Sequence, residues 1–248
     1  DGVLFSKDGT KLLLYPANKS DIFYQIPEGT ELVENNAFQN NSKLKQVVLP
    51  DSVTVIGVEA FNYCIGLTQV SLNEGLKEIG DSAFSACYKL GSIELPATLE
   101  SIGDGAFFAT GLTDISVSEN SQSYCSRDGI LFSKDGSTLV FYPPKRSDTS
   151  YTVPEGVQII GPYALSGNNN LTGVVLPEGL CYIEKFACAY SKLDSITIPQ
   201  SLMQIDTAAF FLCDKLQSIF YGGDERQWME LAIGQLNEAL ENQPIHYS

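Results

Sequence analysis

The sequence Leu67-Thr68-Gln69-Val70-Ser71-Leu72 is one copy of a segment that recurs at intervals of about 23 residues. Other copies are Leu44-Lys45-Gln46-Val47-Val48-Leu49-Pro50, Leu90-Gly91-Ser92-Ile93-Glu94-Leu95-Pro96 and Leu112-Thr113-Asp114-Ile115-Ser116-Val117. Self-similarity at such a period is typical of solenoid proteins, because one unit is too small to bury its own apolar face. The repeat therefore predicts stacked coils and favours an extended binding surface over chemistry in a pocket.

Each copy has a second half, which carries an apolar pair, a glycine and the dipeptide Ala-Phe. Residues 53–61 read Val-Thr-Val-Ile-Gly-Val-Glu-Ala-Phe, and residues 76–84 and 99–107 repeat this pattern. In the first half, the last four positions alternate, which predicts a strand with one buried face. Proline ends this strand at Pro50, since proline cannot continue a ladder. Ala-Phe followed by small polar residues predicts one tight helical turn with the Phe pointing inward.

A larger duplication lies over the repeat. Residues 1–10 reappear as residues 128–137, and the likeness continues without a gap to Pro27-Glu28-Gly29 and Pro154-Glu155-Gly156. Asp-Gly between two apolar runs is a strong signal for a β-hairpin. We therefore predict that a hairpin module opens the array of coils and interrupts it once.

The end of the chain differs from the repeat. Asp224 is expected to cap a helix, with Gln227 as its capping-box partner. Trp228 and Leu231 would lie on one face of that helix, which would cover the last coil, and 245–247 would add a strand. Because Asp1 begins abruptly, we expect a chain cut from a longer array at its N-terminal side, with a natural C-terminal end.

These features predict an α/β solenoid that is rich in β structure, has short helical turns and is capped by a C-terminal helix. We expect a single repeat domain over residues 1–248. Its expected parts are a hairpin module with the start of the first coil (1–30), a first block of repeats (31–127), a second hairpin module (128–156), a second block (157–220) and a C-terminal cap (221–248).

The charge of the chain excludes several classes of partner. Thirty acidic and fifteen basic residues give a net charge of −15 and a pI near 4.3. Such a surface repels phosphate backbones and anionic lipid, so we expect no nucleic-acid binding. No apolar run approaches the roughly 18 residues of a spanning helix, so we expect no membrane insertion by this region.

The six cysteines form no CxxC pair, but Cys64, Cys87 and Cys213 each stand three residues after the repeat Phe. One interpretation is a disulfide or metal ladder across neighbouring coils. The other, which we favour, is a set of small buried thiols under the turn. The sequence leaves open whether Cys64 and Cys87 are free thiols.

No constellation for catalysis, cofactor binding or metal binding is present. The single histidine, His246, stands near the end of the chain, where a structural role is expected. Asp8-Gly9 and Asp135-Gly136 do not have the regular oxygen ligands of a calcium loop and are explained by turn chemistry. We therefore expect no enzyme activity and no cofactor or metal.

The outward strand positions remain as candidate binding residues, since solenoids usually bind with such a sheet face. Two rows are expected, and a merely solvated face is the alternative. The first row is Lys45, Thr68, Thr113, Thr172, Asp194 and Gln217; the second is Val48, Ser71, Glu94, Ser116, Val175, Thr197 and Phe220. The rows are mostly polar, with no aromatic platform, and the two hairpins are further candidates.

The pattern Leu-x-x-Ile-x-Leu-Pro-x-x-Leu-x-x-Ile-Gly-x-x-Ala-Phe-x-x-Cys resembles the repeat of BspA-like leucine-rich repeat proteins. The Asp-Gly-Val-Leu-Phe-Ser-Lys-Asp-Gly segment and the ending Tyr-Gly-Gly…Gln-Trp…Ile-His-Tyr are also similar to that family. Departures are local: Cys188 replaces the Phe, Thr110 stands where Cys is usual, and Glu184 and Asp206 replace the Gly.

The resemblance implies a right-handed leucine-rich-repeat superhelix from a gut or oral bacterium, secreted or held at the cell surface. It also implies adhesion by binding a protein or glycan, such as host extracellular matrix or another bacterium, and we expect a monomer. The alternative function is a structural spacer that displays another domain away from the cell wall. The residues do not identify the ligand or the anchor.

Overall fold

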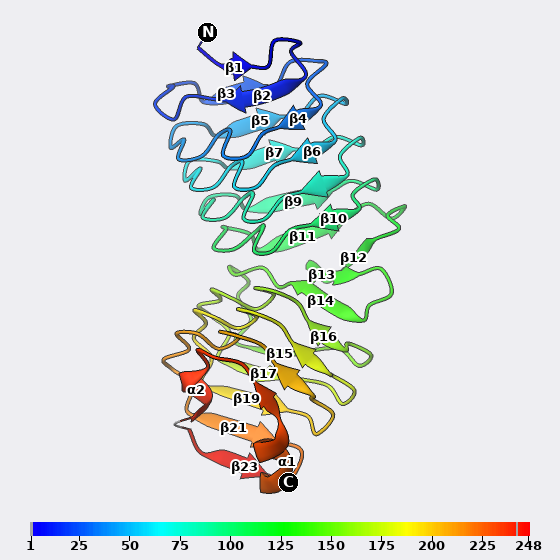
Figure 1. Ribbon diagram of the computed structural model, residues 1–248, viewed down its shortest axis with the longest axis vertical. Helices are drawn as coiled ribbons and strands as arrows, with labels where there is room; N and C mark the ends of the chain where they lie inside the picture. Colours follow the sequence, from blue (N-terminus) through cyan, green and yellow to red (C-terminus); the bar gives the residue numbers. More distant parts are fainter. Residues whose placement is uncertain (1, 242) are drawn as a thin grey trace. The chain divides into compact units, whose positions relative to one another are not determined.

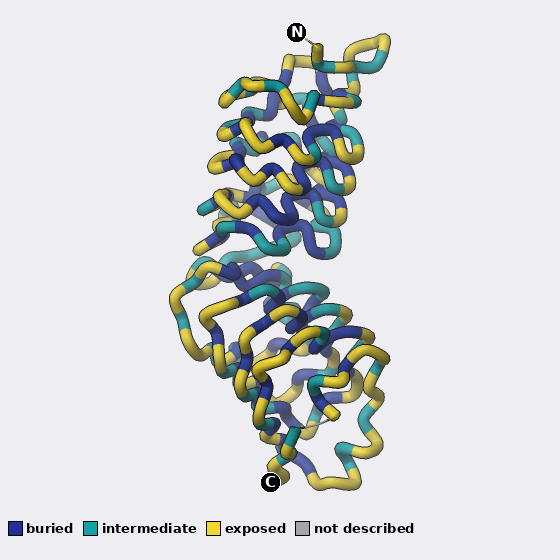
Figure 2. Tube along the Cα trace, turned by 90° about the vertical axis from the view of Figure 1, so that its left-hand side faces the viewer, coloured by how far each residue is buried: buried dark blue, intermediate teal, exposed yellow. Residues whose placement is uncertain are grey.

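The computed structural model describes residues 2–241 and 243–248, which form two compact units with a boundary after Lys134. Each unit is a stack of coils, and Figure 2 shows buried and exposed segments alternating along the coils. The strands of unit 1 are β1 (Leu4–Phe5), β2 (Lys11–Leu14), β3 (Phe23–Gln25), β4 (Leu32–Val33), β5 (Gln46–Val48), β6 (Val55–Ile56), β7 (Gln69–Ser71), β8 (Glu78–Ile79), β9 (Ser92–Leu95), β10 (Ser101–Ile102), β11 (Asp114–Val117), β12 (Tyr124–Arg127) and β13 (Ile130–Ser133).

The elements of unit 2 follow the same order, with two short helices near the end (Figure 1). They are β14 (Thr138–Phe141), β15 (Ser150–Thr152), β16 (Ile159–Ile160), β17 (Gly173–Val175), β18 (Tyr182–Ile183), β19 (Ser195–Ile198), β20 (Gln204–Ile205), β21 (Ser218–Tyr221), α1 (Glu225–Glu230), β22 (Ala232–Ile233), α2 (Glu238–Glu241) and β23 (Ile245–Tyr247). No helix in the described residues is long and apolar enough to span a bilayer.

Two kinds of parallel sheet run along each stack. The first half of the repeat forms the long-strand sheet, ordered β3-β5-β7 and β9-β11 in unit 1 and β15-β17-β19-β21-β23 in unit 2. The apolar pair of the second half forms the short-strand sheet, which includes β2-β4-β6-β8-β10 in unit 1 and β14-β16-β18-β20-β22 in unit 2. Within each of these ladders a strand pairs with its equivalent one coil away, so repeat positions lie in rows.

A ladder of phenylalanine rings fills the core of unit 1. Phe38, Phe61, Phe84 and Phe107 are at most 2% exposed. Successive ring centroids are 4.7, 5.2 and 5.8 Å apart, with nearly parallel planes. These distances follow from the spacing of about 4.7–4.9 Å between neighbouring strands. The prediction that the repeat Phe points inward is confirmed.

The helical turn predicted at Ala-Phe is wrong. Glu59 and Tyr63 have φ angles of 54° and 57°, which a right-handed helical turn does not contain. The N–H of Ala60 donates to the carbonyl of Gly57 within the coil (3.2 Å), whereas the N–H of Phe61 donates to Ala83 of the next coil (2.7 Å). Alternate N–H groups thus close turns and bind the neighbouring coil. The architecture is a β-solenoid with few helical residues, and the α/β class is corrected accordingly.

The Asp-Gly hairpins form. β1 pairs with β2 in antiparallel fashion around Asp8-Gly9, and β12 pairs with β13. Asp128 and Gly129 have φ angles of 51° and 74°, and positive φ at both positions defines the I′ turn that suits a two-residue hairpin. Asp8 accepts hydrogen bonds from the hydroxyl of Ser6 (2.5 Å) and the N–H of Thr10 (3.1 Å). These bonds lower the pKa of Asp8 to about 2 and support turn chemistry rather than ion binding.

The C-terminal helix forms with the predicted capping box. Asp224 accepts from the N–H of Gln227 (2.8 Å), whose side chain accepts from the N–H of Asp224 (2.9 Å). However, α1 contains no buried residue, and Trp228 lies edge-to-face on Tyr221 with the ring centroids 5.2 Å apart. The last rung is instead added by β22, which pairs with β20, and by β23, which pairs with β21. The expected cap by a helix is therefore corrected to a cap built largely from strands.

Candidate interaction surface

The second predicted row lies on the outer face of the long-strand sheets. Val48 pairs with Ser71, and Glu94 with Ser116, in unit 1. In unit 2 the row runs in register through Val175, Thr197 and Phe220. The residues before them in each strand, such as Val47 and Ile196, are buried, so the row points outward.

The first predicted row does not lie in the strands, which is a correction. Every strand of this sheet begins one residue later, so Lys45, Thr68, Thr113, Thr172, Asp194 and Gln217 all precede a strand and are exposed. Their backbone forms the connection between coils; for example, the N–H of Thr68 donates to Lys45 (2.8 Å). The hydroxyls of Thr68 and Thr172 also donate to the preceding coil, at 3.0 and 3.1 Å. The threonines of this row therefore contribute to stacking of the coils.

A different row shares the outer face with Val48 and Ser71. It consists of the first residue of each strand, namely Gln46, Gln69, Ser92 and Asp114 in unit 1 and Gly173, Ser195 and Ser218 in unit 2. Gln46 pairs with Gln69, and Ser92 with Asp114. Sequence reasoning missed this row, although the period of two around the buried Val47 indicates it. The outer face is thus mainly amide, hydroxyl and carboxylate groups.

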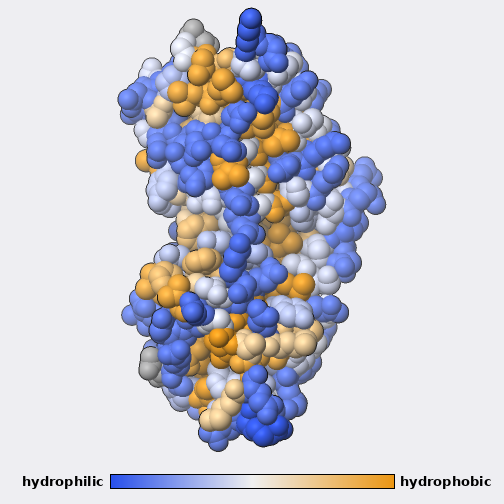
Figure 3. Space-filling model, viewed as in Figure 1, coloured by the Kyte–Doolittle hydropathy of each residue, from blue (hydrophilic) through white to orange (hydrophobic). Residues whose placement is uncertain are grey.

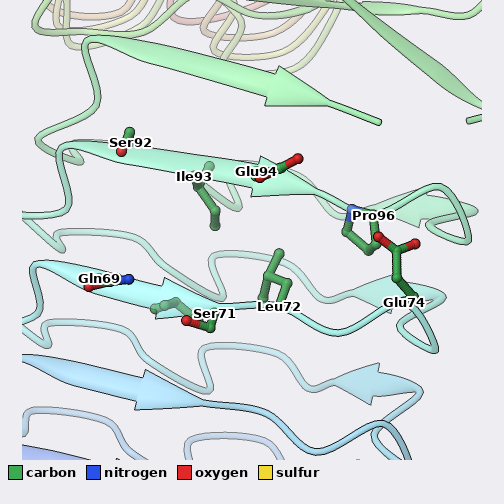
Figure 4. Close-up of a pocket in the computed structure, with 9 residues that line it drawn as sticks. Gln69, Ser71, Leu72, Glu74, Ser92, Ile93, Glu94 and Pro96 are labelled. Carbon is green, nitrogen blue, oxygen red and sulfur yellow. The ribbon is translucent and has the colours of Figure 1, made fainter. Parts of the chain in front are cut away.

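The long-strand sheet of unit 1 is interrupted between β7 and β9, which are not neighbours in one ladder. An open hollow of about 350 Å³ lies there, and Figure 4 shows side chains from both strands around it. Glu94 projects from β9, and Glu74 lies beside Pro96, where it accepts from the N–H of Ala97 (3.3 Å). The hollow places polar side chains around an opening between two coils.

The end of the long-strand sheet in unit 2 carries an aromatic pair. Phe220 is 45% exposed and pairs with His246 of β23. Their ring centroids are 4.9 Å apart at an interplanar angle of 20°. The expectation that these rows lack an aromatic platform is wrong at this end, because His246 adds a second ring beside Phe220. The face shown in Figure 3 mixes polar and apolar residues in both units.

The repeat cysteines are buried and bind the backbone. Cys64 donates to the carbonyl of Phe38 (3.0 Å) and Cys87 to that of Phe61 (3.2 Å), each in the preceding coil. Burial raises the pKa of Cys64 to about 12 and that of Cys87 well above its ordinary value. The distances support the interpretation of buried thiols under the turn. Among the described residues, no group of three or more His, Cys, Asp or Glu side chains is placed to hold a metal ion.

Each hairpin module also contains a cluster that the sequence analysis missed. Asp148 accepts from the hydroxyl of Tyr142 and from Nε of Arg146, both at 2.7 Å. These hydrogen bonds lower the pKa of Asp148, and burial raises that of Tyr142. The first copy has Tyr15, Lys19 and Asp21 in the same arrangement. The duplication itself was the available signal, since both copies keep Tyr and Asp six residues apart. All three residues of each cluster lie within one hairpin module.

Comparisons with known proteins agree with this architecture. The chain resembles the structure of the pneumococcal vaccine antigen PcpA, with 28% identity and a TM-score of 0.74, over 89% of this chain and 61% of that one. It therefore spans about three fifths of that structure. A leucine-rich repeat protein from Eubacterium ventriosum is 18% identical (TM-score 0.65; 91% and 78% covered). A leucine rich cell surface protein from Faecalibacterium prausnitzii is 23% identical (TM-score 0.50; 94% and 96% covered).

A search of curated proteins finds no match. The sequence pattern of the BspA type leucine rich repeat region, in contrast, matches six copies within residues 20–127 and 139–227. These ranges cover most of both units and contain the Phe ladder and most strands of the two kinds of parallel sheet. The chain belongs to the BspA-type leucine-rich repeat proteins.

Proposed function

We propose that this chain is a non-enzymatic binding module that acts outside a bacterial cell and recognises a protein or glycan with its long-strand sheets. The observation that supports this most directly is the outer face described above. Rows of amide, hydroxyl and carboxylate groups lie in register along parallel strands, while the opposite face of the same strands is buried. A repeat stack presents such rows as one extended surface.

The extracellular location is part of the proposal. Its support is the similarity to PcpA, a vaccine antigen, and to the F. prausnitzii cell surface protein. The acidic charge of −15 adds support, because it disfavours nucleic acid and anionic lipid as partners. We propose a monomeric module in a single repeat domain, with the partner drawn from host extracellular matrix or another bacterium.

The test is an array of host matrix proteins and glycans probed with the chain and two variants. Ser71→Arg places a long charged side chain in the middle of the outer row, whereas Glu100→Arg places one on an exposed site between β9 and β10, directly before a strand of the short-strand sheet. We expect binding that Ser71→Arg weakens at least tenfold and Glu100→Arg leaves unchanged. An array without signal above background contradicts the binding role, and equal effects of both variants contradict its location.

A structural spacer is the second candidate. The observation in its favour is the unbroken ladder of buried rings from Phe38 to Phe107, because a continuous core stiffens a stack. A recognisable binding or catalytic domain in the full-length gene product, together with a silent array, would favour this function.

A further inference from the structure

The short-strand sheet of unit 2 contains a second hollow, which is separate from the long-strand surface. Its volume is about 360 Å³, and it opens to solvent. It is lined by Ile159, Tyr182, Ile183, Glu184, Gln204 and Asp206. The lining thus combines an aromatic ring, an amide and two carboxylates, with no lysine or arginine.

The register of the sheet places the four polar or aromatic groups in a square. Tyr182 of β18 pairs with Gln204 of β20, and the residues that follow them, Ile183 and Ile205, are buried. Glu184 and Asp206 follow directly after these two strands, are half-buried, and line the hollow. Residues paired on adjacent strands are expected to lie about 5 Å apart, and residues two positions apart in one strand about 7 Å apart. Tyr182 is 40% exposed, so its ring is accessible.

The two carboxylates stand at a repeat position that is glycine in several other coils. In unit 1 a Cβ atom at Gly80 would lie 2.6 Å from the backbone nitrogen of Val58, and one at Gly103 would lie 2.3 Å from that of Asp81. Two adjacent coils of unit 2 nevertheless carry Glu184 and Asp206 at this position. Stacking of the coils does not require an acidic side chain there, since Gly80, Gly103 and Gly161 occupy the same position in other coils. The presence of Glu184 and Asp206 at this position therefore needs an explanation other than stacking.

The first coil shows which group such a carboxylate binds. Glu34 occupies the same repeat position, and its Oε1 lies 3.7 Å from Nζ of Lys11 on the adjacent strand β2. In unit 2, Asp206 accepts from the N–H of Thr207 (2.6 Å) and, among the described residues, forms no ion pair with a basic side chain. The hollow beside Asp206 thus offers a place for a cation supplied from outside the chain.

We propose that this hollow binds an arginine or lysine side chain in an extended segment of a protein partner. The face of the Tyr182 ring attracts the cation, the carboxylate of Asp206 pairs with it, and Gln204 supplies hydrogen bonds to the segment. The net charge of −15 steers basic partners toward the surface. This inference rests on the proposed binding function and specifies a partner chemistry for a second surface.

The test uses a fluorescein-labelled peptide, Gly-Arg-Gly-Arg-Gly, and its analogue with glutamine in place of arginine, in fluorescence polarisation at low salt. We expect only the arginine peptide to bind. Asp206→Asn and Tyr182→Leu should each weaken binding about fivefold, whereas Tyr182→Phe, which keeps the ring, should not. Glu78→Gln removes an exposed carboxylate from the short-strand sheet of unit 1 and is the matched control. Binding should largely disappear in 0.5 M salt.

The proposal is overturned if the glutamine peptide binds equally well, or if Glu78→Gln weakens binding as much as Asp206→Asn. Binding of N-acetylglucosamine oligomers that Tyr182→Leu abolishes but Asp206→Asn does not would also overturn it, in favour of a glycan. Thermal melting of each variant guards against misfolding. If the array described above returns a ligand while the arginine peptide fails, this inference fails and the proposed function remains.

Discussion

Replacing Phe84 tests the ring ladder on which the fold depends. Phe84 is fully buried, and its ring is stacked between those of Phe61 and Phe107, at 5.2 and 5.8 Å. Truncation of a buried Phe to Ala costs about 3–5 kcal/mol. We expect Phe84→Ala at the upper end of this range, because two aromatic contacts of about 0.5–1.5 kcal/mol each are lost with the ring. Phe84→Asp should unfold the adjacent coils, since the buried charge has no partner.

The assay is urea denaturation followed by circular dichroism, combined with hydrogen exchange to locate the coils that open. Exchange is needed because long repeat stacks need not unfold in two states. Tyr88→Ala in the same coil is the control, since Tyr88 is 50% exposed and should change stability by less than about 0.5 kcal/mol. A loss below about 1 kcal/mol in Phe84→Ala, or faster exchange confined to unit 2, would refute the placement of this ring.

Four further predictions concern the turns, the thiols and the hairpin modules. Ala86 has a φ of 58°, a conformation that glycine adopts without steric cost, so Ala86→Gly should be neutral or slightly stabilising. Ala83 does not have a positive φ, so Ala83→Gly should lower stability. The midpoints of urea denaturation compare the two variants. Native Cys64 and Cys87 should resist Ellman's reagent at pH 8 until urea unfolds the chain; rapid labelling would contradict their burial. Folding raises the pKa of the Cys64 thiol from 9.0 to about 12, because the thiol is buried. The stability that the neutral thiol contributes should therefore be fully present below pH 9 and fall as the pH rises toward 12. Cys64→Ser should flatten this dependence of the melting temperature on pH. Folding lowers the pKa of Asp148, so the stability that its carboxylate contributes should be present above its ordinary pKa of 3.8 and decline as the pH falls below it. Asp148→Asn should therefore lower the melting temperature at pH 7, and this loss should shrink at acid pH. A loss that does not change with pH would argue against a role for its charge.

The core could be predicted because the apolar residue types that form it recur at fixed positions of the repeat. The recurrence of Leu, Ile and Phe predicted the stack, the strands and the inward Phe, and the Asp-Gly pairs predicted the hairpins. The conformation of the turns around the repeat Phe could not be predicted in the same way. Their left-handed positions are occupied by residues as different as Glu59, Tyr63 and Ala86, and none of these has a strong preference for positive φ. Hydrogen bonds to the next coil, which no local pattern encodes, hold them there.

The candidate surface was predicted only in part, for a geometric reason. The strand begins at Gln46 rather than at Lys45, and a shift of one residue changes which side chains share a face. The row through Ser71 and Phe220 was placed in the strands correctly, whereas the row through Lys45 was not. The contribution of His246 was missed because its rung comes from the end of the chain, outside the regular repeat.

Side-chain footprinting with hydroxyl radicals, with and without the partner captured on the array, measures the central claim most directly. The account predicts that a bound partner protects exposed, reactive side chains of the long-strand sheets, foremost Phe23 and Phe220, which are 49% and 45% exposed. Tyr63 and Leu212, in the turns, are 51% and 50% exposed and should keep their labelling rates. Protection of Tyr63 or Leu212 with Phe23 and Phe220 unchanged would contradict binding by the long-strand sheets.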